Sequence, residues 1–276
     1  MKIGIVAPAC RLEPAMAGRV SAAARMQWGG RAPVLDFHPQ CFLSDGHFAG
    51  GDAARADALV EAANDPSCDA VWFARGGYGS CRLLPLVLPR LTDAARHKTY
   101  LGYSDTGFLL AGLLGLGFPH LAHGPMPADI QREGGESAVL RALSFLVEGA
   151  SATVEPHASE APSLAFNLTI LSHLIGTPWQ PDVAGRVLMI EEVSEHMYAF
   201  DRALFHVTGN PQIRKAAGIR LGRVSAVPPN EPAFGRTEEE VVRHWCELSG
   251  IPWLGRADIG HDAANKIVPF GQAGAA

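Results

Sequence analysis

The chain has 276 residues, a net charge of −5 and a hydrophobic content of 47%, as expected for a globular protein of one large or two medium domains. No basic cluster stands out, so we expect no nucleic-acid partner. No apolar run approaches the roughly 20 residues needed to span a bilayer, so we expect no membrane association. Residues 1–8 resemble a buried strand rather than a secretion signal, and we therefore expect a cytoplasmic protein.

The cysteines and histidines show no metal-binding or disulfide pattern. Five cysteines are scattered along the chain without a C-x-x-C pair, which favours reduced thiols. The eleven histidines form neither H-x-x-x-H nor H-E-x-x-H. The sequence therefore predicts no metal and no cofactor.

The first half of the chain alternates short apolar segments with helical patterns. Strands are predicted at 2–7, 34–37, 69–74, 100–102 and 120–123, and helices at 13–27, 81–87, 136–147 and from Asp52, taken as an N-cap. This alternation predicts an α/β domain over residues 1–150, with a doubly wound, mainly parallel sheet of the Rossmann or flavodoxin-like kind.

A change of composition follows. Residues 151–164 are rich in Ala, Ser, Pro and Glu and are predicted to form a linker. Beyond it, helices are predicted at 168–175, 198–207 and 238–249, and strands at 186–191, 219–224 and 266–270. Residues 165–276 are therefore expected to form a smaller, mixed α/β C-terminal domain.

Ser104 lies at a predicted strand-to-helix turn, where the chain reads Gly102-Tyr103-Ser104-Asp105-Thr106. A sharp turn of this kind can expose a nucleophilic serine above the end of a sheet, and the usual pattern is G-x-S-x-G. Here threonine replaces the second glycine. On this motif alone, Ser104 is better explained as a helix N-cap than as a nucleophile.

Two other loops are predicted at the same edge of the sheet, where parallel sheets bind their ligands. The segment 75–80, Arg-Gly-Gly-Tyr-Gly-Ser, follows the third strand, and His123-Gly124-Pro125 follows the fifth. The glycine pair can form a simple tight turn, or it can expose backbone N–H groups to an oxyanion. It lacks the G-x-x-x-x-G-K-[ST] spacing of a phosphate-binding loop.

A serine nucleophile needs a base and a group that orients the base. Glu191 ends an apolar strand, and His261 lies in a glycine-preceded loop. Either residue alone is better explained as solvated. Together, Ser104, Glu191 and His261 follow the chain order nucleophile, acid, base.

At this point the motifs resemble those of the LD-carboxypeptidase family, serine peptidases that include muramoyltetrapeptide carboxypeptidase and the microcin-immunity hydrolases. The matching residues, which span nearly the whole chain, are 5–8 (IVAP), Gly51-Asp52 with Arg55, 75–79 (RGGYG), 102–105 (GYSD), 123–126 (HGPM), Asn167-Leu168, 176–178 (GTP), 190–192 (IEE) with Tyr198 and Asp201-Arg202, and Gly260-His261.

The resemblance implies that Ser104 is the nucleophile, His261 the general base and Glu191 the acid that orients it. It also implies an oxyanion hole made of the backbone N–H groups near Gly77 and at Asp105. Candidate substrate-binding residues are Arg75, for a terminal carboxylate, together with Tyr78 and Asn167.

The sequence departs from the family pattern before Asn167 and after Glu191. Ala165-Phe166 stands where the family has two glycines, and Glu192 where it has aspartate. The chain also ends soon after residue 271, earlier than is typical. None of these changes touches the predicted triad, although the first could reshape the substrate pocket.

The implied function is removal of the terminal D-alanine from cytoplasmic murein tetrapeptides in peptidoglycan recycling, by a homodimer. An alternative is hydrolysis of a peptidyl-nucleotide antibiotic or another amidated peptide by the same triad. Base stacking would favour an aromatic ring in that site, and between Pro127 and Ala165 the only one is Phe145, which favours the murein substrate. A second alternative is a non-catalytic protein that binds cell-wall peptides.

Overall fold

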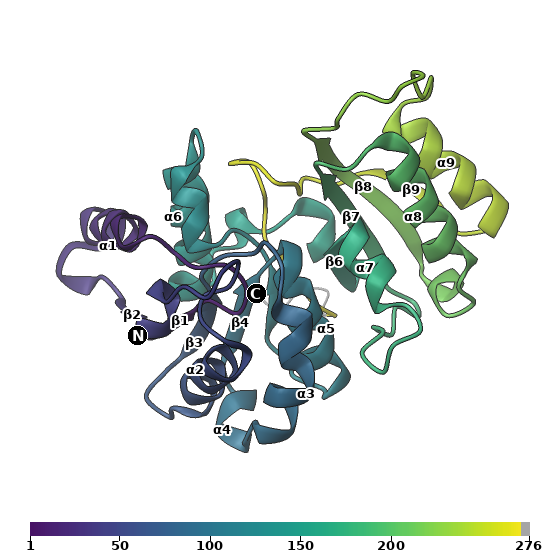
Figure 1. The fold of residues 1–276 in the computed structure, drawn as a ribbon. Helices are drawn as coiled ribbons and strands as arrows, with labels where there is room; N and C mark the ends of the chain where they lie inside the picture. The colour runs from purple at the N-terminus through teal and green to yellow at the C-terminus, as the bar shows by residue number, and fades with distance from the viewer. Residues whose placement is uncertain (272–276) are drawn as a thin grey trace.

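The computed structural model describes residues 1–271 and divides them between two sheets (Figure 1). The larger sheet has the order β10-β5-β4-β3-β1-β2, in which the first five strands of the chain run parallel and β10 is antiparallel to β5. Its strands are β1 (Lys2–Val6), β2 (Val34–Phe37), β3 (Ala70–Phe73), β4 (Thr99–Gly102), β5 (Leu121–His123) and β10 (Val268–Pro269).

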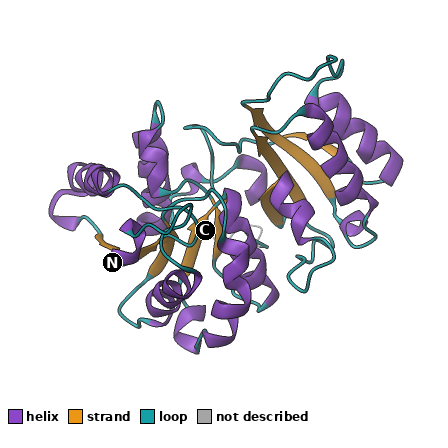
Figure 2. Ribbon diagram, viewed as in Figure 1, coloured by secondary structure: helices purple, strands orange, loops and turns teal. Residues whose placement is uncertain are grey.

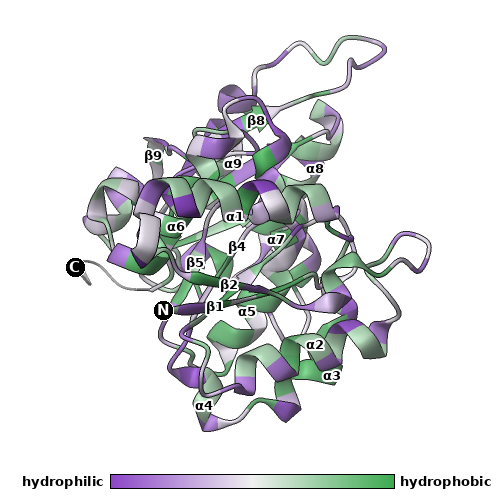
Figure 3. Cartoon of the chain, turned by 90° about the vertical axis from the view of Figure 1, so that its left-hand side faces the viewer, coloured by the Kyte–Doolittle hydropathy of each residue, from purple (hydrophilic) through white to green (hydrophobic). Residues whose placement is uncertain are grey.

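Helices cover both faces of this sheet (Figures 2 and 3). One face carries α1 (Pro14–Trp28) and α6 (Gly135–Glu148), which pack on each other. The other face carries α2 (Asp52–Asn64), α3 (Leu84–Val87), α4 (Asp93–Arg96) and α5 (Gly107–Gly115). The doubly wound, flavodoxin-like prediction is confirmed, since the strand order 2-1-3-4-5 places a change of winding direction between β1 and β3.

The strands read as nearly continuous apolar segments because both of their faces are buried. Ile3, Ile5 and Trp72 pack toward α1 and α6, whereas Val71 and Phe73 pack toward α2, α3 and α5. Figure 3 shows hydrophobic residues along the strands and hydrophilic ones on the outer helix surfaces and loops.

The second sheet has the order β6-β7-β8-β9 and is parallel throughout. Its strands are β6 (Ser163–Asn167), β7 (Val187–Val193), β8 (Gly218–Ser225) and β9 (Trp253–Arg256), connected by α7 (Leu168–Leu174), α8 (Met197–Gly209) and α9 (Glu238–Ser249). Helix α9 begins at a capping box between Thr237 and Glu240, as its sequence favours. The two sheets are joined where α5 packs on α7.

Four details differ from the sequence-based elements. The N-cap of α2 is Gly51, and Asp52 is the first helical residue, where its charge still faces the positive end of the helix. Strand β6 begins at Ser163, inside the expected linker, and β9 was not expected at all. The terminal strand β10 returns to the first sheet, where Val268 pairs with His123.

Candidate active site

The turn between β4 and α5 holds Ser104 in a strained conformation. Its φ is +59°, in the left-handed region that costs a non-glycine residue about 1–2 kcal/mol. Gly102 precedes it where a Cβ would lie 2.5 Å from Thr106 Oγ1 and 2.7 Å from Phe73 Cδ2, so the chain can turn this tightly only with glycine there. The geometry is that of a nucleophile elbow rather than of an N-cap, and Tyr103 is the residue that precedes the short 3-10 turn Ser104–Thr106.

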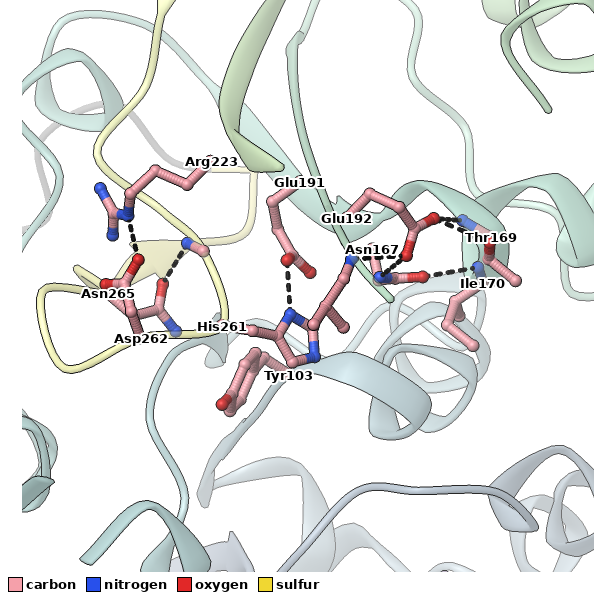
Figure 4. A network of polar contacts seen from close by, with 12 residues as sticks. Tyr103, Asn167, Thr169, Ile170, Glu191, Glu192, Arg223, His261, Asp262 and Asn265 are labelled. Carbon is pink, nitrogen blue, oxygen red and sulfur yellow. Dashed lines mark hydrogen bonds and ion pairs between the residues drawn. The ribbon is translucent and has the colours of Figure 1, made fainter. Parts of the chain in front are cut away.

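His261 and Glu191 form a buried pair beside Tyr103, the residue that precedes Ser104 (Figure 4). His261 Nδ1 and Glu191 Oε2 are 2.5 Å apart, and the two residues are 8% and 0% exposed. Burial alone would lower the pKa of His261, but the charge and hydrogen bond of Glu191 raise it above its usual value. The Nε2 atom of His261 is buried and has no hydrogen-bond partner within residues 1–271, so the Ser104 hydroxyl does not bond to it in this structure.

The glycine loop after β3 lies directly against Ser104. A Cβ on Gly76 would be 3.1 Å from the Ser104 Oγ. Gly77 has a φ of +110°, and a Cβ there would overlap the Sγ of Cys10. Among residues 1–271 the Gly77 N–H makes no hydrogen bond, which leaves it available to an oxyanion.

Two arginines that the sequence did not single out hold the loop around His261. Arg132, which follows the 3-10 turn Pro127–Gln131, donates to the His261 carbonyl at 2.6 Å and to Asp129 at 2.7 Å. Arg223, on β8, pairs with Asp258 at 2.6 Å and with Asp262, so it binds one carboxylate before and one after His261 in the sequence. Neither arginine lies in a recognisable motif, because the partners are a backbone carbonyl for Arg132 and carboxylates distant in sequence for Arg223.

Tyr103 links the nucleophile turn to the base. Its ring lies 4.8 Å from that of His261, and its hydroxyl donates to Asp129 at 2.8 Å. His123, paired with Gly102 across β4 and β5, also packs on Tyr103, with ring centres 5.5 Å apart. Burial lowers the pKa of His123 to about 4, so this histidine is neutral at pH 7 and serves as packing.

The three candidate substrate-binding residues differ in how free their polar atoms are. Arg75 donates one bond to the Arg11 carbonyl at 3.2 Å, and Tyr78 is 50% exposed. Asn167 is buried, with its amide nitrogen 2.6 Å from Glu192 and its oxygen capping α7 at the N–H of Ile170. Glu192 also accepts bonds from Thr169, and burial raises its pKa (Figure 4). Asn167 and Glu192 therefore shape the start of α7 beside Glu191.

An apolar pocket of about 380 Å³ opens beside the glycine loop, between α5 and α7. No local motif predicts this pocket, because its lining comes from three separate stretches of the chain, 77–84, 105–108 and 169–179. It is lined by Gly77, Tyr78, Asp105, Phe108, Ile170 and Trp179, among others.

Within residues 1–271 no cluster of three or more His, Cys, Asp or Glu side chains could hold a metal ion. No helix in the same range is both long and apolar enough to cross a bilayer.

Comparisons with known proteins identify the family of the chain. Residues 3–124 match the LD-carboxypeptidase N-terminal domain and residues 160–275 match the LD-carboxypeptidase C-terminal domain. The murein tetrapeptide carboxypeptidase of Pseudomonas aeruginosa is 28% identical over 242 residues, 82% of this chain and 78% of that protein. The Synechocystis sp. protein slr1534, which carries a provisional carboxypeptidase name, is 33% identical over 235 residues, 82% of this chain and 75% of its own length.

Solved structures show the same fold. The muramoyltetrapeptide carboxypeptidase of Oxalobacter formigenes superposes with a TM-score of 0.80 at 22% identity, over 98% of this chain and 93% of that one. MccF in complex with glutamyl sulfamoyl guanosine superposes with a TM-score of 0.79 at 18% identity, over 98% and 91% of the two chains.

The class of protein that these matches define is a peptidase. The chain belongs to the LD-carboxypeptidase family.

Proposed function

We propose that the chain is a serine carboxypeptidase that releases the terminal D-alanine from murein tetrapeptides. The observation that carries the proposal is the strained Ser104, at φ +59°, combined with the buried His261–Glu191 pair, in which His261 Nε2 has no hydrogen-bond partner among residues 1–271. A carboxypeptidase acting on murein tetrapeptides is also named among the relatives.

In this mechanism His261 Nε2 takes the proton from Ser104 Oγ while that oxygen attacks the carbonyl carbon of the scissile bond. The negative charge that develops on the carbonyl oxygen is accepted by the backbone N–H groups of Gly77 and Asp105. His261 then returns the proton to the leaving amine, and D-alanine departs. Water, activated by the same imidazole, hydrolyses the acyl-enzyme and regenerates Ser104.

Glu191 has two roles in these steps. Its bond to Nδ1 keeps the proton on that nitrogen, so that Nε2 is the basic atom, and its charge stabilises the imidazolium that forms. Full burial strengthens both effects, because water does not screen the pair.

A second candidate, hydrolysis of a peptidyl-nucleotide or another amidated peptide, is favoured by the apolar pocket. Trp179 and Tyr78 line it beside Gly77, and aromatic rings can stack on a nucleobase. Phe145, the ring considered from sequence, lies instead in a cavity formed with Thr99 and Leu121, at the opposite ends of the strands. A non-catalytic binding role has less support, since binding alone would not need a strained serine facing a buried base.

The experiment is to incubate the purified protein with a murein tetrapeptide, with its all-L counterpart and with an aminoacyl sulfamoyl nucleoside. Alanine release from the tetrapeptide alone is the expected result. Release from neither peptide would contradict the proposal, and cleavage of only the nucleoside conjugate would support the second candidate. We further propose that the enzyme works in the cytoplasm in peptidoglycan recycling, as a homodimer.

A further inference from the structure

The glycine loop after β3 is fixed at Gly79 from two opposite sides. The Gly79 N–H donates to the Asp105 carboxylate at 3.3 Å, and the Gly79 carbonyl accepts from Arg55 Nη1 at 3.0 Å. Ser80 adds two bonds to Asp105, from its N–H to the carboxylate at 2.9 Å and from its hydroxyl to the backbone carbonyl at 2.5 Å. The loop is therefore bonded to the residue that directly follows Ser104.

Arg55 is a fully buried side chain that connects three loops. Besides Gly79, its guanidinium donates to the carbonyls of Pro8 and of Gly50, the latter at 3.2 Å, and it pairs with Asp52. These loops follow β1, precede α2 and follow β3, so Arg55 joins the two sides of the topological switch point. Because a buried guanidinium with this many partners must satisfy all of them, its position is fixed.

The packing around Gly79 leaves no room for a side chain. Gly79 has a φ of +130°, and a Cβ there would lie 2.8 Å from Phe48 Cε1 and 2.9 Å from Arg55 Nη1. The Arg55 guanidinium lies over the Phe48 ring at 4.6 Å. Asp105 and Arg55 thus determine where the loop stands relative to the nucleophile turn.

We propose that Asp105, through its side chain, and Arg55 are positioning residues that hold the Gly77 N–H in register with Ser104. The inference rests on the proposed function, in which Gly77 supplies an oxyanion donor. Neither side chain touches the reacting atoms. A shift of about 1 Å in such a donor can cost on the order of 100-fold in rate, which is the scale of effect expected here.

The kinetic test uses Asp105→Asn, which keeps the size of the side chain but replaces one acceptor oxygen with a donor that faces an N–H group. The expected result is a kcat lower by about 10- to 100-fold with KM changed by less than about 3-fold, as for an interaction made in the transition state. The acid limb of the pH profile, set by His261, stays in place. Wild-type kcat in this variant would overturn the proposal.

Arg55 has a matched control in Arg82, whose half-exposed side chain also pairs with Asp52, at 2.8 Å. Among residues 1–271, Arg82 bonds to the Gly79 carbonyl only through its backbone N–H, which a lysine keeps, at 3.3 Å. Arg55→Lys is expected to lower kcat in the same way as Asp105→Asn, whereas Arg82→Lys is expected to keep it. Equal losses in the two lysine variants would show that Asp52 pairing, and not the hold on Gly79, determines the rate.

Amide hydrogen exchange tests, without any substrate, whether Asp105 holds the glycine loop. Asp105→Asn should speed exchange in the segment 76–80 by about 10-fold or more, since one of the two N–H groups bonded to this carboxylate, those of Gly79 and Ser80, loses its acceptor. Asp129→Asn is the control, because this buried carboxylate accepts the Met126 N–H at 2.8 Å and does not contact the loop. Unchanged exchange at 76–80 in Asp105→Asn would overturn the proposal that Asp105 holds this loop. Failure of the proposed function would appear separately, as a wild-type protein that releases no alanine.

Discussion

Replacement of Ser104 by glycine should stabilise the protein relative to replacement by alanine. At an ordinary helical position glycine is less stable than alanine by about 1 kcal/mol. Ser104 instead has a φ of +59°, where any residue with a Cβ pays about 1–2 kcal/mol and glycine pays almost nothing. Glycine gives back about 0.5–1 kcal/mol through the greater freedom of its unfolded chain. The net expectation is an advantage of about 0.5–1 kcal/mol for Ser104→Gly over Ser104→Ala.

Urea unfolding of the two variants, followed by circular dichroism, measures this difference. With a slope near 3 kcal/mol/M, the midpoint of Ser104→Gly should lie roughly 0.2–0.3 M above that of Ser104→Ala. Both variants lack the hydroxyl, so neither should release alanine. A midpoint for the glycine variant that is lower by a similar amount would refute the strained turn, and with it the reason for regarding Ser104 as a nucleophile rather than a cap.

Three further predictions concern the groups around the base. Glu191→Gln should lower kcat by about 10⁴-fold, and since the charge that raises the pKa of His261 is gone, the acid limb of kcat/KM should move to lower pH; an unmoved limb would contradict the assignment. His123→Leu should reduce the loss of stability in acid. The pKa of His123 is about 4 in the folded protein and 6.5 in the unfolded chain, so up to about 3 kcal/mol of unfolding free energy that is present above pH 6.5 is lost as the pH falls through 4. Equal slopes of unfolding free energy against pH in the variant and the wild type would disprove this. Arg132→Met should lower kcat by about 10-fold or more, because the hydrogen bond to the His261 carbonyl is lost. Arg141, which donates to the carbonyls of Ala263 and Asn265 in the same loop, is the control, and Arg141→Met should keep kcat. Equal losses in the two variants would reject that role for Arg132.

The local pattern of the sequence was sufficient for most elements of the fold. Strand β2 and helix α9 have the predicted bounds, because one follows a proline directly and the other begins at a capping box. Strand β6 was missed because Ser163 and Pro162 give its start the composition of a linker. The pairing of β10 with β5 could not be predicted, since it joins residues more than 140 positions apart and depends on how the second domain returns the chain.

In the candidate site too, local motifs were sufficient for some residues, whereas residues that act through contacts made on folding were missed. Ser104, Glu191 and His261 were predicted from short motifs and stay a proposed triad; the structure shows the left-handed φ of Ser104 and the buried His261–Glu191 pair. The turn's left-handed φ had only an indirect signal, in Gly102. Arg132 and Arg223 had none, because their partners are a backbone carbonyl and carboxylates brought near by folding.

The most direct test of Ser104 as the nucleophile is to trap the acyl-enzyme. The protein would be mixed with a murein tetrapeptide, quenched in acid within one turnover and digested for mass spectrometry, with Ser104→Ala as the control. We expect the peptide containing Ser104 to gain the mass of the substrate less D-alanine, and the control to gain nothing and to release no alanine. Alanine release with no adduct on Ser104, and with turnover preserved in Ser104→Ala, would contradict this role of Ser104.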